Sequence, residues 1–169
     1  IIQMNKVVGL AIAGTIVYGI VKLLKVQNVT ELATLSLLNP RVHQINLSGL
    51  YFRTEVSINN PSRDSIKITK PVVSLSTNGK FLSQSNAEDK IIVIKPLGVT
   101  QIDTIEVQLS WTVLAGLLSN IITKIPSVIA AFKAGNKKNL VAQLGIPMEM
   151  SFSTYVNGLF YQSPPTKLI

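Results

Sequence analysis

The longest regular alternation of apolar and polar residues lies between Gly49 and Ser62. Side chains of a strand point alternately to its two faces, so the alternation predicts a strand with one buried and one solvent-facing side. Glu55 falls on the solvent-facing side, and Pro61 ends the strand because proline has no N–H for a ladder. The residues predicted to be buried are Leu50, Phe52, Thr54, Val56 and Ile58.

Several further runs have the same extended character. Asn78-Gly79 and Asn157-Gly158 each join two of these runs, and Asn-Gly is typical of a two-residue type I′ hairpin turn. Two hairpins with alternating arms predict a mainly β fold, a β-sandwich of antiparallel strands. The predicted strands are Arg41–Leu47, Ile66–Thr69, Val72–Thr77, Lys80–Ser83, Ile91–Lys95, Ile102–Trp111, Met148–Val156 and Leu159–Gln162.

The pattern changes over residues 111–135, which predict a helical insertion. Residues 111–122 are apolar on nearly every side and lack alternation, as in a buried helix. Pro126 is expected to break this helix, and Ser127 to cap a second one that ends at Gly135.

The most hydrophobic part of the chain is near its start. Residues 7–24 contain one charge, Lys22, and about 20 apolar residues suffice to cross a bilayer. Residues 1–25 are therefore predicted to form an N-terminal transmembrane helix, with Lys6 and Lys22 reaching the two interfaces. The apolar anchor residues are Val7, Leu10, Ile12, Ile16, Val17, Ile20 and Val21.

Two other interpretations of this segment stay open. A secretory signal would have the same charged start, but the sequence shows no clean cleavage site with a polar continuation. A buried core helix would have to accept glycine at positions 9, 14 and 19, where glycine costs helix stability. Residues 26–39 are predicted to be a connector with a short helix ended by Asn39-Pro40, and residues 40–169 the sandwich domain.

Charge indicates the kind of partner. The chain carries 16 basic and 8 acidic residues, a formal net charge of +8 that favours anionic partners such as phospholipid headgroups. Aromatic residues make up only 6%, and no basic stretch is interleaved with them, which disfavours nucleic acid. Lys133, Lys137 and Lys138 follow the second predicted helix, either as a solvated helix end or as a basic patch for an anionic surface.

Catalytic patterns are absent from the sequence. No nucleophile elbow, phosphate-binding loop or zinc-protease motif occurs, and there is no cysteine. The single histidine, His43, is interpreted as structural, and the close acidic pairs Glu88-Asp89 and Asp103/Glu106 fall in a loop and on a solvent-facing strand side. We therefore expect no enzyme, no cofactor and no metal ion.

The order of the strands resembles a known family. The segments VSINNPS (56–62), STNGKFLSQS (76–85), IIVIKP (91–96) and IDTIEVQLS (102–110) are similar to the water-stress and hypersensitive-response (WHy) domain of group-2 late-embryogenesis-abundant proteins. The motif residues here are Asn59, Asn60 and Pro61, with Ser62 where the family usually has a second asparagine. The resemblance implies an immunoglobulin-like antiparallel sandwich that binds or scaffolds and protects against water stress.

These features together predict a non-enzymatic, single-pass membrane protein whose sandwich meets the lipid bilayer and one or more protein partners. The side of the membrane, and whether the chain forms a homo-oligomer, stay open. An alternative role is a structural component of a larger assembly, such as a minor capsid or spike-base protein in a virion membrane. In such an assembly, neighbours would hold the apolar start and the tail SPPTKLI in place.

Overall fold

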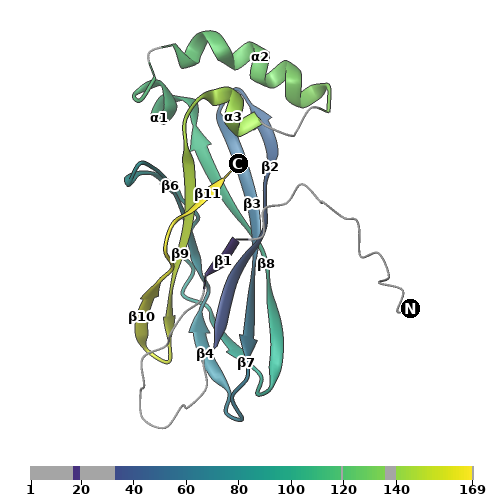
Figure 1. The fold of residues 1–169 in the computed structure, drawn as a ribbon, viewed down its shortest axis with the longest axis vertical. Helices are drawn as coiled ribbons and strands as arrows, with labels where there is room; N and C mark the ends of the chain where they lie inside the picture. The colour runs from purple at the N-terminus through teal and green to yellow at the C-terminus, as the bar shows by residue number, and fades with distance from the viewer. Residues whose placement is uncertain (1–16, 20–32, 119, 136–139, 169) are drawn as a thin grey trace, which may run out of the picture.

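Two antiparallel sheets with helices at one end make up the fold (Figure 1). The computed structural model describes residues 17–19, 33–118, 120–135 and 140–168. The first sheet has the order β1-β2-β3-β8, with β3 in a central position. Its strands are β1 (Val17–Gly19), β2 (Thr34–Asn46), β3 (Gly49–Asn60) and β8 (Gly98–Ser110).

The second sheet is built around β9 (Met148–Val156). One edge of β9 pairs with β4 and then β5, and its other edge pairs with β10 and then β11. The outer edges of β4 and β5 pair with β7 and β6. The bounds are β4 (Ile66–Thr69), β5 (Val72–Thr77), β6 (Lys80–Gln84), β7 (Ile91–Ile94), β10 (Leu159–Gln162) and β11 (Thr166–Leu168).

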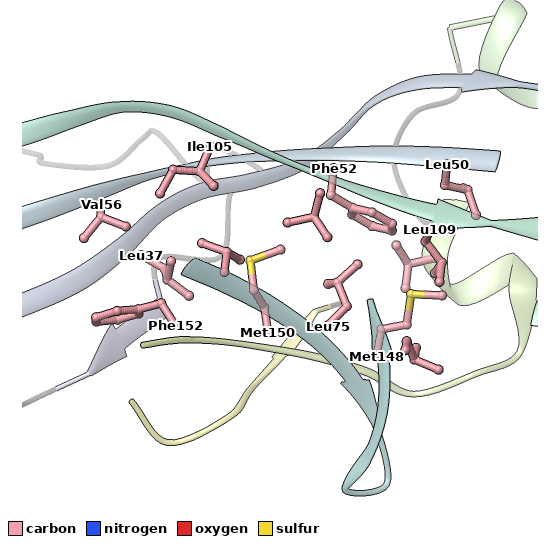
Figure 2. Close-up of a cluster of buried hydrophobic side chains, with 14 of the residues drawn as sticks. Leu37, Leu50, Phe52, Val56, Leu75, Ile105, Leu109, Met148, Met150 and Phe152 are labelled. Atoms are coloured by element: carbon pink, nitrogen blue, oxygen red, sulfur yellow. The ribbon is translucent and has the colours of Figure 1, made fainter. Parts of the chain in front are cut away.

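The inner faces of both sheets share one hydrophobic core (Figure 2). Phe52 and Val56 enter it from β3, and Met150 and Phe152 enter it from β9 on the facing sheet. All four side chains are buried, so each large side chain contributes roughly 1.5–3 kcal/mol by leaving water. The predicted fold class, mainly β with antiparallel sheets and a helical insertion, is confirmed at this level.

The alternation in the sequence is reproduced in the burial of β3 and β9. The five positions predicted to be buried in β3 are all buried, and so are Met148, Met150, Phe152, Thr154 and Val156 in β9. Both predicted hairpin turns are present, with positive φ at Asn78 and Gly79 and at Asn157 and Gly158 as type I′ turns require. Glu55 in β3 and Ser151 in β9 are the exceptions, because both fall on the solvent-facing side of the alternation and are buried.

The helical insertion is confirmed, but its division differs from the prediction. Helix α1 (Trp111–Ala115) is capped by the Ser110 hydroxyl and is followed by α2 (Ile121–Lys133) and by α3 (Leu140–Leu144), which was not predicted. The expected break at Pro126 is wrong, since α2 continues through this residue. The carbonyl of Ile122 loses its helical partner there, but Ile122 is exposed and water can hydrogen-bond it.

The prediction of a short helix before Asn39-Pro40 is also wrong where the structure describes it. Residues 34–38 belong to β2, and Asn39 and Pro40 interrupt that strand as a bulge instead of ending a helix. Leu35 and Leu37 are buried and alternate with less buried neighbours, so they fit a half-buried strand. Strand β2 therefore begins seven residues earlier than the predicted strand at Arg41.

The C-terminal tail is held by its own chain. Strand β11 pairs with β9, with Thr166 opposite Met150 and Leu168 opposite Met148. This pairing within one chain explains where the tail lies. The position of the tail therefore gives no support to the expectation that neighbouring subunits hold it.

The predicted anchor lies almost wholly outside the described residues. Of its apolar residues only Val17 is described, and it belongs to β1, which pairs with β2 at Leu35–Leu37. At Val17–Gly19 the structure thus shows a strand where the sequence predicted a helix; Val7, Leu10, Ile12, Ile16, Ile20 and Val21 fall outside the described part. Among the described residues, no helix has the length and apolar character needed to cross a membrane.

Candidate functional site

The family-like motif forms a loop that ties the two sheets together at the end opposite the helices. The side chain of Asn60, the last residue of β3, is fully buried. Its amide nitrogen donates to the carbonyl oxygens of Asp64 at 2.9 Å and Lys95 at 3.1 Å. Its amide oxygen accepts the backbone N–H of Ser62 at 3.1 Å. Only an amide side chain offers two donors and an acceptor in this compact form.

The neighbours of Asn60 complete the loop. Ser62 is buried; its hydroxyl accepts the N–H of Asp64, and its carbonyl accepts the N–H of Leu97. The β3–β4 loop is therefore hydrogen-bonded to the β7–β8 turn from both Asn60 and Ser62. Asn59, in contrast, is exposed, so the buried contacts of the motif come from the second asparagine. This geometry gives the motif a structural role, closing one end of the fold.

A second polar cluster lies at mid-length of β3, where both neighbouring strands are irregular. The pairing of β3 with β2 changes register between Leu38 and Arg41 of β2. The pairing of β3 with β8 changes register between Thr54 and Val56 of β3. Asn39 in the bulge has a φ of 48°, a left-handed conformation that asparagine tolerates better than most residues. The bulge displaces backbone carbonyls from the regular ladder, and these need other donors.

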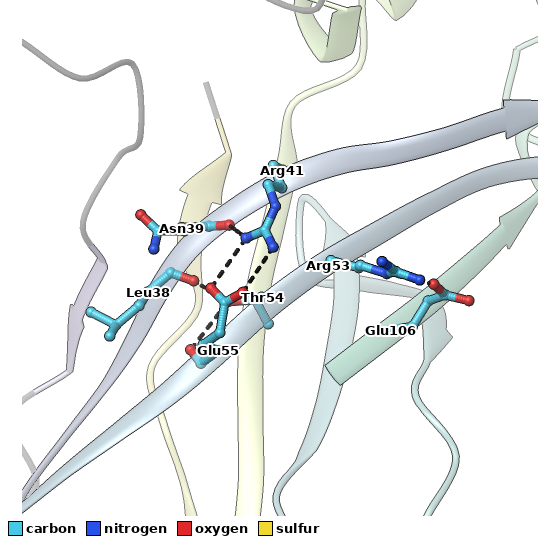
Figure 3. A network of polar contacts seen from close by, with 7 residues as sticks. All are labelled: Leu38, Asn39, Arg41, Arg53, Thr54, Glu55 and Glu106. Atoms are coloured by element: carbon cyan, nitrogen blue, oxygen red, sulfur yellow. Dashed lines mark hydrogen bonds and ion pairs between the residues drawn. The ribbon is translucent and has the colours of Figure 1, made fainter. Parts of the chain in front are cut away.

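Arg41 and Thr54 supply those donors (Figure 3). The guanidinium of Arg41 donates to the Asn39 carbonyl at 2.9 Å and to both carboxylate oxygens of Glu55 at 2.8 and 3.1 Å. The Thr54 hydroxyl donates to the Leu38 carbonyl at 2.8 Å. The bidentate pair with Glu55 raises the pKa of Arg41 above its ordinary value, burial partly opposes this, and Coulombic attraction adds to it. Glu55 is thus buried as an ion pair, which the alternation in the sequence could not show.

A double-mutant cycle on this pair has a clear expected result. Arg41→Met combined with Glu55→Gln should give a coupling free energy of about 1 kcal/mol, because the contact is bidentate and the Glu55 side chain is 12% exposed. The matched control is Arg53 with Glu106, where both side chains are more than a third exposed, and its coupling should be about 0.3 kcal/mol. Urea unfolding of the variants measures both values, and equal coupling would contradict the role assigned to Arg41.

The remaining sequence candidates are dispersed. Lys133 is exposed in the last turn of α2, while Lys137 and Lys138 lie outside the described residues. His43 is exposed on β2, and no hydrogen bond or ion pair of its side chain is recorded among the described residues. Within the described ranges, no group of three or more His, Asp or Glu side chains could hold a metal ion. The acidic residues Asp103 and Glu106 are exposed on β8, and Glu106 is bonded to Arg53.

Comparison with known proteins finds similarity among solved structures only. No family model matches the chain, and no curated protein matches it. A crystal structure of a protein from Archaeoglobus fulgidus is similar, with 13% sequence identity and a TM-score of 0.44, covering 82% of this chain and 98% of that one. At this level of similarity the comparison supports no argument about fold or function.

Proposed function

We propose that this protein is a non-enzymatic binding or scaffolding sandwich, immunoglobulin-like and of WHy type, held at a membrane by its apolar N-terminal segment. The observation that carries the proposal is the position of the core. The buried hydrophobic residues of the described part, from Ala33 to Val156, form one core shared by the two sheets. Residues 7–24 are the most apolar run in the chain, and a bilayer is the solvent that suits such a run. Insertion of the whole run requires Val17–Gly19 to leave their pairing with β2.

The resemblance of the motif supports the scaffolding part of the proposal. In WHy domains an Asn-Pro ends the second strand, and here Asn60 holds the β3–β4 loop against the β7–β8 turn through three hydrogen bonds. A loop fixed in this way keeps the surface around it rigid, as a binding or scaffolding role requires. Stress protection, in which the domain shields membranes or proteins during water loss, is the role that the family likeness suggests.

Membrane fractionation tests the proposal. The full chain should stay in the membrane pellet after salt and carbonate washes, whereas a chain beginning at Val26 should be released. Release of the full chain by salt alone would contradict a spanning anchor, since salt removes only electrostatic attachment.

A further inference from the structure

Exposed apolar side chains concentrate at one end of the sandwich. Strand β8 runs from the β7–β8 turn up to α1, so the loops that follow β3, β7 and β9 lie at the end opposite the helices (Figure 1). Seven of the eleven exposed large hydrophobic residues in the described part lie within four residues of these loops. They are Ile91, Val93, Leu97, Val99, Tyr155, Leu159 and Phe160.

Three of them form a continuous row with Thr69, which we call the outer stripe: Ile91, Thr69, Tyr155 and Phe160. Ile91 is opposite Thr69, the Tyr155 N–H donates to the Thr69 hydroxyl at 2.9 Å, and Tyr155 is opposite Phe160. The rings of Tyr155 and Phe160 meet edge to face, 5.5 Å between centroids. The stripe crosses β7, β4, β9 and β10 on the face turned away from the core, and Ile91, Tyr155 and Phe160 are 65%, 50% and 61% exposed.

Basic side chains surround the stripe. Lys67 is directly opposite Val93, and Arg63, Lys90 and Lys95 are exposed in or beside the loops at this end. No ion pair is recorded for these four residues within the described part of the chain. The acidic residues of this end are Asp64, Asp89 and Glu88, and Glu88 is neutralised by Lys70. Four free cations against two free carboxylates make this end complementary to an anionic surface.

Strand β2 also begins at this end. Ala33, just before it, is buried in the core, and Thr34 is opposite Asn59, one residue before the buried Asn60. Eight residues lie between Leu24, the end of the apolar run, and Ala33, which are therefore nine Cα–Cα steps apart. A fully extended chain of that length spans at most about 30 Å. An apolar segment inserted in a bilayer would therefore keep this end, and not the helical end, close to the lipid headgroups.

We propose that this end of the sandwich docks directly on the anionic phospholipid headgroups of the membrane that holds the N-terminal segment. This inference rests on the proposed function and adds a second contact to the anchor. Aromatic side chains with one polar edge, such as Tyr155, favour the boundary between headgroups and acyl chains. Lysine stems can lie along the apolar surface while their ammonium groups reach lipid phosphates. The stripe and the four basic residues together supply both kinds of contact.

The absence of cysteine from the 169 residues allows a direct test on the whole chain given by the sequence. One variant carries Val93→Cys beside Lys67, and the matched control carries Leu47→Cys, which is 89% exposed at the helical end. Each is labelled with an environment-sensitive fluorophore and incorporated into vesicles of phosphatidylcholine alone or with phosphatidylserine. We expect a blue shift at position 93 with phosphatidylserine and none at position 47.

Charge removal sharpens the test. Adding Lys67→Gln and Lys95→Gln to the Val93→Cys chain should lower the ratio of docked to free sandwich about 30-fold, because each lysine near an anionic membrane contributes roughly a factor of five. The blue shift should fall accordingly, and raised salt should have the same effect. Both lysines are exposed, so the fold should be unchanged by circular dichroism.

The outcomes separate the docking from the anchor. If the chain floats with both vesicle types but the fluorophore at position 93 shows no blue shift, the proposed docking is wrong and the membrane anchor is supported. Flotation only with phosphatidylserine, with a shifted label, supports the docking and contradicts the anchor. No flotation with either lipid overturns both. A shift that grows with protein concentration in detergent, without anionic lipid, would show self-association and overturn the docking.

Discussion

Replacing Phe52 with alanine is expected to lower the free energy of unfolding by about 4 kcal/mol, the largest effect of any single substitution proposed here. Phe52 is buried in β3, opposite Val42 on one side and Val107 on the other, and it faces the second sheet across the core (Figure 2). Removing a buried phenyl ring loses the free energy gained when the ring moves from water into the core. It also leaves a cavity that the two flanking strands cannot close. Urea unfolding followed by circular dichroism measures the change.

The matched control is Phe81→Ala. Phe81 lies on β6 with 60% of its surface exposed, so its removal should change the free energy of unfolding by about 0.5 kcal/mol or less. Similar losses at Phe52 and Phe81 would mean that the core does not lie between the two sheets as described. A much larger loss of unfolding free energy at Phe52 than at Phe81, with the same dependence on denaturant concentration, supports a core between the two sheets.

Asn60→Ala should be the second most damaging substitution, with a loss of about 3 kcal/mol. The change removes three hydrogen bonds, each contributing about 1 kcal/mol, from a fully buried position. It leaves the carbonyls of Asp64 and Lys95 without these donors, and unpaired buried polar groups are costly. Thermal or urea unfolding of the purified variant gives the value.

Asn59→Ala is the control within the same motif. Asn59 is exposed, and no side-chain hydrogen bond from it is recorded among the described residues. Its substitution should therefore cost about 0.5 kcal/mol or less. If both asparagine variants were equally stable, the motif would have no structural role, and its resemblance to the WHy family would need a different explanation.

Local rules of strand and turn geometry explain why much of the fold could be predicted. The two-residue period in β3 and β9 identifies the buried face, and Asn-Gly identifies two hairpins, because these signals depend only on neighbouring residues. Part of the candidate site could also be predicted: the resemblance to a known family identifies Asn60 as a motif residue. It could not show that the side chain of Asn60 bonds Lys95, which is distant in the chain.

The errors occurred where a distant contact decides the local structure. Asn39-Pro40 resembles a helix end, yet the carbonyl of Asn39 is satisfied by Arg41, which is in turn held by Glu55 on the next strand (Figure 3). The alternation predicts Glu55 on the solvent-facing side because it contains no information about Arg41, the partner that covers this carboxylate. The sequence does not predict the outer stripe for a related reason, since only the order of strands in the sheet brings Ile91 beside Thr69 and Thr69 beside Tyr155.

The central claim is that a self-sufficient sandwich is joined to a membrane anchor, and one paired fractionation tests it most directly. The full chain and a chain beginning at Val26 are expressed side by side, and membranes are washed with high salt and then with carbonate. We predict that the full chain resists both washes, while the shorter chain is released by salt and shows β-rich circular dichroism. If the shorter chain is unfolded or insoluble, residues 1–25 are part of the folded core and the two-part architecture is wrong.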